Sequence, residues 1–384
     1  DDKLELKGII PRHKYLDVLY QHLKNEQIIF LTGLRRIGKT TLLKLLIKKM
    51  IENDIPAKNI LYVSLDDYVF RNYNIFDILD EFRKIHRLSI DEKVFLFFDE
   101  VIYMQDYHQQ LKNIFDRMNA KVFATSSSSI KLKDTKAFLT GRSYVINIHP
   151  LTFNEYLIFK SINIKKRDMK LLEPYFIDYL KTGGIPYYVL YEKREFLLNL
   201  IDSIIYKDII SEHGIKNPQI INDYFLLLME RSGKQLSINK IANILKISVD
   251  SSKKYLSYFN ETFLINLLPR FGNTNEKILS PKKIYSSDLG IKYAFTELRD
   301  LGSYFENYIY LILQDNELYY IYENGNEIDF YIRNHDALIE AKFNGKLTDK
   351  QKDLFDNFHA KNKYIIDSVY KLDELSDFNN INGV

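Results

Sequence analysis

The residues with the clearest chemical meaning lie in the stretch GLRRIGKTT, between positions 33 and 41. Gly33, Gly38, Lys39 and Thr40 occupy the fixed positions of the pattern G-x-x-x-x-G-K-[ST]. Glycines let the backbone turn so that successive N–H groups face an anion, and a helix that follows adds partial positive charge. We therefore expect a cradle for nucleotide phosphates, made by Gly33, Leu34, Arg35, Arg36, Ile37, Gly38, Lys39, Thr40 and Thr41.

Two pairs of residues divide the expected chemistry. Lys39 would reach the β and γ phosphates of ATP, and the Thr40 hydroxyl would ligate Mg²⁺. Downstream, the segment EKVFLFFDEV ends an apolar run with Asp99 and Glu100. Asp99 would hold Mg²⁺, and Glu100 would polarise the attacking water as general base. The two pairs together predict hydrolysis of ATP as well as binding.

Two later segments carry further candidates for the same site. ATSSSSI, residues 124–130, places hydroxyl groups after an apolar run, so Thr125 or Ser126 can sense the γ phosphate, unless the segment is an ordinary polar loop. Arg142 lies just before the run YVINIH. Arg142 could stabilise the charge of phosphoryl transfer, serve a neighbouring subunit of a homo-oligomer, or form a structural ion pair.

A second group of chemically capable residues lies near the carboxyl end. Asp329 is in EIDF, and Glu340 and Lys342 are in IEAKF. Residues two apart on a strand share a face, so Glu340 and Lys342 point the same way, and Asp329 can join them from a neighbouring strand. Two acids can bind Mg²⁺, and a lysine beside them can orient or deprotonate water. Glu306, on a predicted preceding helix, can add a metal ligand.

Apolar patterning predicts the elements that position the first site. Short apolar runs typical of buried strands alternate with helical stretches, which indicates an α/β fold with a parallel sheet. The expected strands are 27–32, 59–65, 94–98, 121–125 and 144–149. Residues 151 to about 225 are predicted to be helical, because aromatic and aliphatic residues recur there at helical spacing.

Residues 236–271 predict a helix-turn-helix. The first helix spans Ile238–Leu245, and the second starts near Val249 with Ser248 as its N-cap. An apolar stripe on the second helix is expected at Val249, Leu256 and Phe259. The opposite face then carries Ser251, Lys253, Lys254 and Tyr258.

Charge adds one observation to this helix pair. Between residues 225 and 283, ten basic residues against four acidic residues leave a net charge of +6, while the whole chain carries +3. A basic second helix can enter the major groove of DNA. A winged helix that serves only as a structural or protein-contact module is the alternative.

Taken together, several motifs resemble a family of prokaryotic AAA+/STAND-type P-loop ATPases. The motifs are GLRRIGKTTLL, FFDEV, TSSSS followed by GR, HPLTFNEYL and TGGIPYYV. The resemblance implies a five-stranded core in the order 5-1-4-3-2, a helical lid and a winged helix. It also implies that Gly183, Gly184 and Pro186 belong to the lid and lie near the nucleotide.

Beyond residue 300 the pattern is a helix, three strands, a helix and a strand. This order resembles the PD-(D/E)XK restriction-endonuclease-like fold, with Asp329, Glu340 and Lys342 in the matching positions. The resemblance implies metal ligation by these acids and by Glu306, with Gln351 as a helper. A domain of this kind can cleave DNA, or it can retain the residues and only bind.

The fold class expected overall is therefore α/β: a P-loop ATPase core of the ASCE/AAA+ type, a helical lid, a winged helix and an α/β restriction-endonuclease-like domain. The expected limits are 1–155, 156–225, 226–275 and 276–384. Hydrophobic residues make up 46% of the 384 residues, enough for several cores, and the lack of cysteine excludes disulfides and thiolate zinc sites.

The functional hypothesis is an ATPase whose nucleotide state controls a DNA-binding, nuclease-like carboxyl-terminal half. ATP and Mg²⁺ are the expected cofactors, and the expected partners are ATP or ADP and duplex or branched DNA. No membrane partner is expected, since no apolar run could span a bilayer, and a charged amino terminus without a signal-peptide pattern favours the cytoplasm. Two alternatives stay open: a STAND-like switch with an inert nuclease-like domain, and a DNA motor that does not cut.

Overall fold

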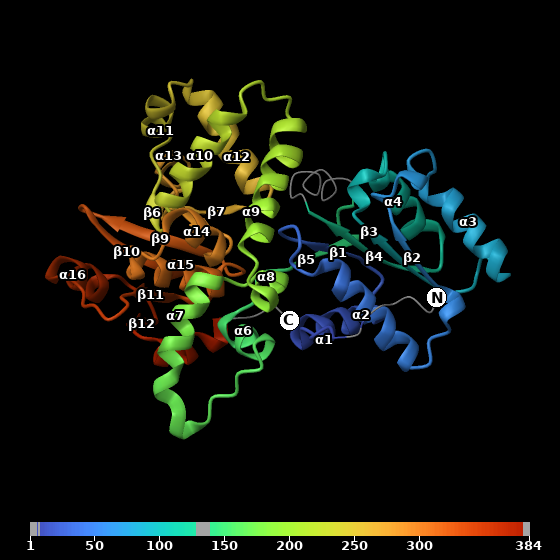
Figure 1. Ribbon diagram of the computed structural model, residues 1–384, viewed down its shortest axis with the longest axis horizontal. Coiled ribbons are helices and arrows are strands. Elements are labelled where there is room, and N and C mark those ends of the chain that lie inside the picture. Colours follow the sequence, from blue (N-terminus) through green and yellow to red (C-terminus); the bar gives the residue numbers. More distant parts are fainter. Residues whose placement is uncertain (1–5, 7, 128–138, 379–384) are drawn as a thin grey trace. The chain divides into compact units, whose positions relative to one another are not determined.

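The chain, as a computed structural model, is described over residue 6 and residues 8–127 and 139–378. These residues fall into two compact units, one that ends at His149 and one that begins at Pro150 (Figure 1). In the part of the chain that the structure describes, none of the helices combines the length and hydropathy that a membrane span requires.

The first unit is built on a parallel five-stranded sheet in the order β2-β3-β4-β1-β5. This is the predicted order 5-1-4-3-2 counted from the other edge, so that prediction is confirmed. The five strands lie within a residue or two of the predicted runs. Their bounds are β1 (Ile28–Thr32), β2 (Ile60–Ser64), β3 (Val94–Asp99), β4 (Ala120–Ser126) and β5 (Ser143–Asn147).

Helices cover both faces of this sheet, with α1 and α2 on one side and α3 and α4 on the other (Figure 1). Successive side chains of a strand point to opposite faces, so both faces of a central strand must be apolar. Phe30 faces α3 and α4, while its neighbours Ile29 and Leu31 are buried on the other side. The helices are α1 (His13–Gln21), α2 (Lys39–Glu52), α3 (Ile75–His86) and α4 (Tyr107–Arg117). Short 3-10 helices span His22–Lys24, Ala57–Asn59, Tyr68–Phe70 and Val101–Tyr103.

The second unit opens with the predicted helical region. Its longest helix changes type: after Ser203 it continues as a π-helix, in which Ile204, Ile205, Ile209 and Ile210 are buried. Pairs of buried residues five apart match the i to i+5 hydrogen bonding of a π-helix. The elements are α6 (Phe153–Phe159), a 3-10 helix (Lys166–Leu171), α7 (Leu172–Thr182), α8 (Pro186–Tyr191), α9 (Arg194–Ser203), the π-helix (Ile204–Ser211) and α10 (Pro218–Glu230).

A three-stranded antiparallel sheet, β6-β8-β7, follows and packs with the predicted helix pair. The helix bounds Ile238–Leu245 and the N-cap Ser248 are confirmed, since the Ser248 hydroxyl accepts from the Ser251 N–H. The elements are β6 (Lys234–Gln235), α11 (Ile238–Leu245), α12 (Val249–Glu261), β7 (Ile265–Leu268), α13 (Thr274–Leu279) and β8 (Lys283–Ser286).

One part of the predicted stripe on α12 is wrong. Leu256 and Phe259 are buried, but Val249 is 37% exposed, and Ser252 is the buried residue one turn before Leu256. Ser252, Leu256 and Phe259 follow the i, i+4, i+7 spacing of one helix face. A serine is tolerated there because its hydroxyl has a buried partner: Ser252 Oγ lies 3.0 Å from the Tyr224 hydroxyl.

The carboxyl-terminal elements form a four-stranded sheet in the order β12-β11-β10-β9. The first three strands are antiparallel, and β12 runs parallel to β11, which confirms the predicted order of helix, three strands, helix and strand. The elements are α14 (Leu289–Thr296), α15 (Leu301–Leu313), β9 (Leu318–Glu323), β10 (Asn326–Ile332), a 3-10 helix (Arg333–His335), β11 (Ala337–Ala341), α16 (Asp349–Asn357), β12 (Asn362–Ile366) and a 3-10 helix (Val369–Phe378).

The two sheets of the second unit are joined through the backbone. The Phe271 N–H donates to the Tyr320 carbonyl at 2.8 Å, and the Tyr320 N–H donates to the Pro269 carbonyl at 3.1 Å. The described residues from Pro150 to Phe378 form one compact unit. The predicted limits at 155, 225 and 275 fall inside α6, α10 and α13.

Candidate functional site

The expected phosphate cradle lies between β1 and α2, at the carboxyl edge of the parallel sheet. Gly33 has a φ of +142°, and a Cβ there would lie 2.3 Å from the Ile148 carbonyl oxygen. Gly38 has a φ of +102° and stands just before α2. The Lys39 ammonium donates to the carbonyls of Gly33 and Leu34 at 2.8 and 3.0 Å. The loop therefore has the backbone that an anion cradle needs, with a buried cation inside it.

Asp99 is the centre of a network of hydroxyl groups beside this loop. The Thr40 Oγ1 donates to Asp99 Oδ2 at 2.7 Å, and the Tyr62 hydroxyl donates to the same oxygen at 3.1 Å. The Thr125 Oγ1 donates to Asp99 Oδ1 at 2.5 Å. Thr40 and Asp99, the two expected Mg²⁺ ligands of this site, are thus brought together, and Thr125 lies beside them.

Tyr62 is a site residue that the sequence argument missed. It lies on β2, two residues before the position that pairs with Asp99. Burial, reinforced by the Asp99 carboxylate, raises the pKa of Tyr62 well above its ordinary value, so the phenol remains a donor. The predicted strand order already placed β2 next to β3, and that was the available signal.

Glu100 follows β3 in a left-handed conformation, with a φ of +50°. Its N–H donates to Thr125 Oγ1 at 2.8 Å. Its carboxylate Oε2 accepts from the backbone N–H and the hydroxyl of Ser127, at 3.2 and 3.0 Å. The end of β4 thus orients both acids, because the Thr125 hydroxyl bridges Asp99 and the Glu100 backbone. Ser128 and Ser129 lie outside the described residues.

The structure does not bring Arg142 to the cradle, which corrects its predicted role in phosphoryl transfer within the same chain. Its carbonyl accepts from the Ile28 N–H at 2.8 Å, where β1 begins, whereas the cradle follows the end of β1. Arg142 precedes a parallel strand, so it must lie at the amino edge of the sheet. Its guanidinium pairs with Asp116 at 2.8 Å, and this pairing lowers the pKa of the Asp116 carboxyl. A role toward a neighbouring subunit stays a prediction.

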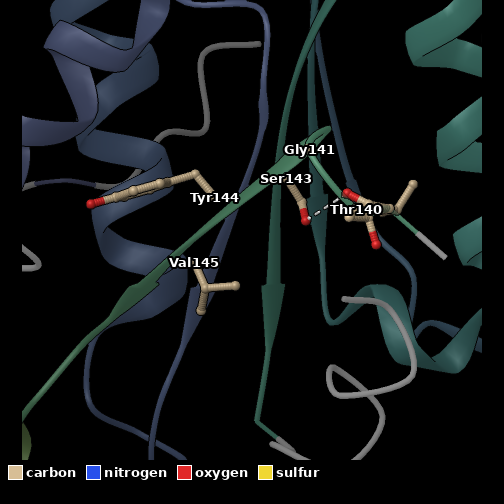
Figure 2. Close-up of a pocket in the computed structure, with 6 residues that line it drawn as sticks. Thr140, Gly141, Ser143, Tyr144 and Val145 are labelled. Atoms are coloured by element: carbon tan, nitrogen blue, oxygen red, sulfur yellow. Dashed lines mark hydrogen bonds between the residues drawn. The ribbon is translucent and has the colours of Figure 1, made fainter. Parts of the chain in front are cut away.

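A pocket beside the start of β5 lies at the same amino edge. Figure 2 shows its lining, in which the Ser143 hydroxyl donates to the Leu139 carbonyl at 3.4 Å. Ser143 pairs with Ile28 at the start of β1, so this pocket is not the nucleotide cradle. Its lining residues are Leu139, Thr140, Gly141, Ser143, Tyr144 and Val145.

The second predicted constellation is also assembled. Asp329 on β10 lies opposite Glu340 on β11, since Phe330 pairs with Ile339 in the antiparallel ladder. The Asp329 N–H donates to Glu340 Oε2 at 3.0 Å. The Lys342 ammonium lies 2.9 Å from Glu340 Oε1. The shared face predicted for Glu340 and Lys342 is therefore confirmed.

An unpredicted lysine also enters this group. The Lys283 ammonium, from β8, lies 2.6 Å from Glu306, 2.7 Å from Glu327 and 3.0 Å from Asp329. In the described residues, no three His, Cys, Asp or Glu side chains are arranged as ligands of one metal ion. The carboxylates surround an ammonium group at hydrogen-bonding distance, and that geometry does not fit a divalent cation at the same position. Metal ligation by Glu306, Asp329 and Glu340 stays a prediction.

Burial raises the pKa of two of these acids. Burial, reinforced by the Asp329 charge, raises the pKa of Glu306 to about 7 and that of Glu340 to about 8.

Gln351, the predicted helper, instead belongs to the N-terminal cap of α16. Its side chain accepts a hydrogen bond from the Thr348 N–H in a capping box. It contacts the Glu327 carbonyl only at 3.5 Å.

The glycines expected in a lid contact other residues of the second unit. Gly184 donates its N–H to the Asp288 carboxylate at 2.6 Å, and a Cβ on Gly183 would lie 2.3 Å from the Gly290 nitrogen. Asp288 also caps α14 through the Ile291 N–H at 3.0 Å. Burial raises the pKa of Asp288 to about 6. Proximity of Gly183, Gly184 and Pro186 to the nucleotide stays a prediction.

The exposed face of α12 carries Lys253 and Lys254. Tyr258, expected on this face, stacks against His213 with ring centroids 3.6 Å apart, and Ser251 bonds to the Ser248 hydroxyl at 2.9 Å. Lys253 and Lys254 are the exposed basic residues of this face, and Lys253 lies 3.9 Å from the exposed Asp250.

Two family models match parts of the chain. Residues 25–157 match the AAA domain family, and residues 173–302 match a domain of unknown function, DUF8612. The uncharacterized protein MJ1544 of Methanocaldococcus jannaschii is 32% identical over 343 residues, which is 84% of this chain and 76% of that protein. The chain belongs to the MJ1544 family.

A similar protein outside the archaea is an uncharacterized protein of Haemophilus influenzae, 24% identical over 374 residues, 93% of this chain and 92% of that one. Among solved structures, the Walker-type ATPase PABY2304 of Pyrococcus abyssi aligns with a TM-score of 0.48 and 14% identity, over 75% of this chain and 96% of that chain. For this member of the MJ1544 family, the matched AAA domain and the parallel sheet establish an AAA-type P-loop ATPase fold in the first unit.

Proposed function

We propose that the first unit binds ATP with Mg²⁺ and hydrolyses it. The observation that carries the proposal is the contact between Thr40 and Asp99, whose oxygens lie 2.7 Å apart beside a loop of anion-binding geometry. Oxygen ligands of this kind are what Mg²⁺ prefers, so the residues present fit the metal. When bound, Mg²⁺ would neutralise charge on the β and γ phosphates.

The chain's own residues divide the remaining work. The cradle amides would hold the phosphates, and Lys39 would exchange its loop carbonyls for phosphate oxygens. Glu100 would accept the proton of the attacking water, once its carboxylate turns from Ser127. Thr125 would hold the backbone of Glu100 and the carboxylate of Asp99 in fixed positions during that step.

Two variants test this proposal. Lys39→Ala should abolish ATP hydrolysis and weaken binding of a fluorescent ATP analogue. Glu100→Gln should still bind the analogue but hydrolyse ATP about 100-fold more slowly, since only the base is lost. Lys48→Ala, at an exposed position on the same helix, is the matched control and should behave like the parent protein. Hydrolysis that survives Lys39→Ala contradicts the assignment.

A specific observation also supports contact with DNA. Lys253 and Lys254 are exposed on α12, in the segment of local net charge +6. We propose that this helix contacts phosphates of duplex or branched DNA. Changing both lysines to Glu should weaken DNA binding, measured by fluorescence anisotropy. The slope of log K against log salt concentration should also become shallower by about 2. The same change at Lys58 and Lys84, two exposed lysines of the first unit, is the control.

The remaining hypotheses differ in what ATP hydrolysis drives. DNA-stimulated ATPase activity without cuts supports a motor. Plasmid cleavage with Mg²⁺ that Glu340→Ala or Lys342→Ala removes supports a nuclease. Absence of DNA binding even at low salt would remove both and leave a STAND-like switch, in which ATP sets an assembly or signalling state.

A further inference from the structure

Lys283 is a fully buried lysine whose ammonium faces several acids. Its side chain has no exposed surface, and the nitrogen lies within 3.0 Å of Glu306, Glu327 and Asp329. These acids come from α15 and β10, while the lysine comes from β8 of the other sheet. A buried charge is stable only when it is paired, and here one cation pairs with three carboxylates.

The three-stranded sheet positions the Lys283 ammonium against the acids. Lys283 is the first residue of β8 and pairs with Gln235 on one side and Leu268 on the other. Tyr285, two residues on and therefore on the same face, donates its hydroxyl to Glu306 at 2.7 Å. The Gln235 side chain donates to Glu327 at 2.7 Å. Three side chains of the three-stranded sheet thus contact Glu306 of α15 and the two acids of β10.

An ammonium and a divalent metal cannot share this position. An ammonium donates hydrogen bonds over 2.6 to 3.0 Å, as observed here. Mg²⁺ requires oxygen ligands at about 2.0–2.1 Å in octahedral geometry, and two cations so close would repel each other strongly. Any divalent cation that used Glu306 and Asp329 as ligands would have to displace the ammonium.

We propose that Lys283 is the resident cation of this carboxylate cluster and that it keeps divalent metal out while β8 stays in place. The four-stranded domain then takes up metal only when the β8 lysine is withdrawn. The contact acts as an internal lock between the two sheets of the second unit. It does not depend on the nucleotide site of the first unit.

The test measures Mn²⁺ binding to the full chain. The electron paramagnetic resonance signal of the Mn²⁺ that stays free in solution reports how much is bound. All proteins carry Asp99→Asn, which removes the metal ligand of the nucleotide cradle. Adding Lys283→Met should create a Mn²⁺ site at least about tenfold tighter than any in the parent, because the carboxylates lose their cation. Further addition of Asp329→Asn should abolish the gained site. Lys282→Met, at the exposed neighbouring position, is the matched control and should gain nothing.

Two results overturn the proposal. One is a folded Lys283→Met protein that gains no Mn²⁺ site. The other is a parent that already binds Mn²⁺ as tightly as the variant and loses it with Asp329→Asn. If Lys283→Met fails to fold, Lys283→Met with Glu327→Gln removes one charge of each sign, so the net charge of the cluster is unchanged. That double variant carries the same expectations, and its melting temperature should rise with Mn²⁺ while that of the parent stays constant.

Discussion

Replacing Thr125 by Val tests the network around the expected catalytic acids. The side chain is fully buried, and valine has nearly the same shape, so the change removes a hydroxyl and little else. That hydroxyl donates to Asp99 at 2.5 Å and accepts from the Glu100 N–H at 2.8 Å. Both acids therefore lose a positioning contact in one substitution.

The structure gives the magnitude. A hydrogen bond to a charged group contributes about 1.5–3 kcal/mol, and a buried N–H left without a partner costs about 1–3 kcal/mol. We expect the first unit to lose about 2–4 kcal/mol of unfolding free energy, since part of the network can relax. The turnover number should fall about 10- to 100-fold, because a misplaced base and a misplaced metal ligand stabilise the transition state less well.

The assay is steady-state ATP hydrolysis together with binding of a fluorescent ATP analogue and urea unfolding. Analogue binding should stay within about threefold of the parent, since the cradle is unchanged. Thr125→Ser keeps the hydroxyl and is the matched control. If Thr125→Val turns over within about twofold of Thr125→Ser, the bridging role of this hydroxyl is refuted.

Three further predictions concern single contacts. Tyr62→Phe removes one of the three hydroxyl donors to Asp99. It should lower the ATP turnover number by less than about tenfold relative to the parent, a smaller loss than that of Thr125→Val in the same assay. Asp288→Ala leaves the N–H groups of Gly184 and Ile291 without an acceptor and should lower the unfolding free energy of the second unit by about 3 kcal/mol in urea. The buried Asp288 should also make the unfolding free energy depend on pH. Its pKa is raised from 3.8 to about 6, so its protonated form stabilises the fold below pH about 4. That contribution, about 3 kcal/mol, is lost as pH rises through about 6, and Asp288→Asn should lack it; parallel stability curves for the two proteins from pH 4 to 8 would contradict this.

The sequence alone determined the features that depend on spacing along the chain. The phosphate loop, the five parallel strands and the helix pair at 238–261 follow from short patterns of neighbouring residues, because glycine, N-caps and side-chain periodicity act locally. The pairing of Asp329 with Glu340 also followed, since a short turn between two strands leaves few registers. The amino-edge place of Arg142 was within reach as well, because a residue before a parallel strand lies opposite the cradle.

Only the tertiary structure decided which cation the carboxyl-terminal acids hold. In the sequence, Lys283 was one of ten basic residues in a positively charged segment, with no local signal that set it apart. Its partners stand 23, 44 and 46 positions away, counted from 283 to 306, 327 and 329. Contacts of that kind arise when β8, α15 and β10 pack together, and residue spacing does not encode how they pack. For the same reason, Ser252 took the core position expected for Val249 only once α12 was packed against its neighbours.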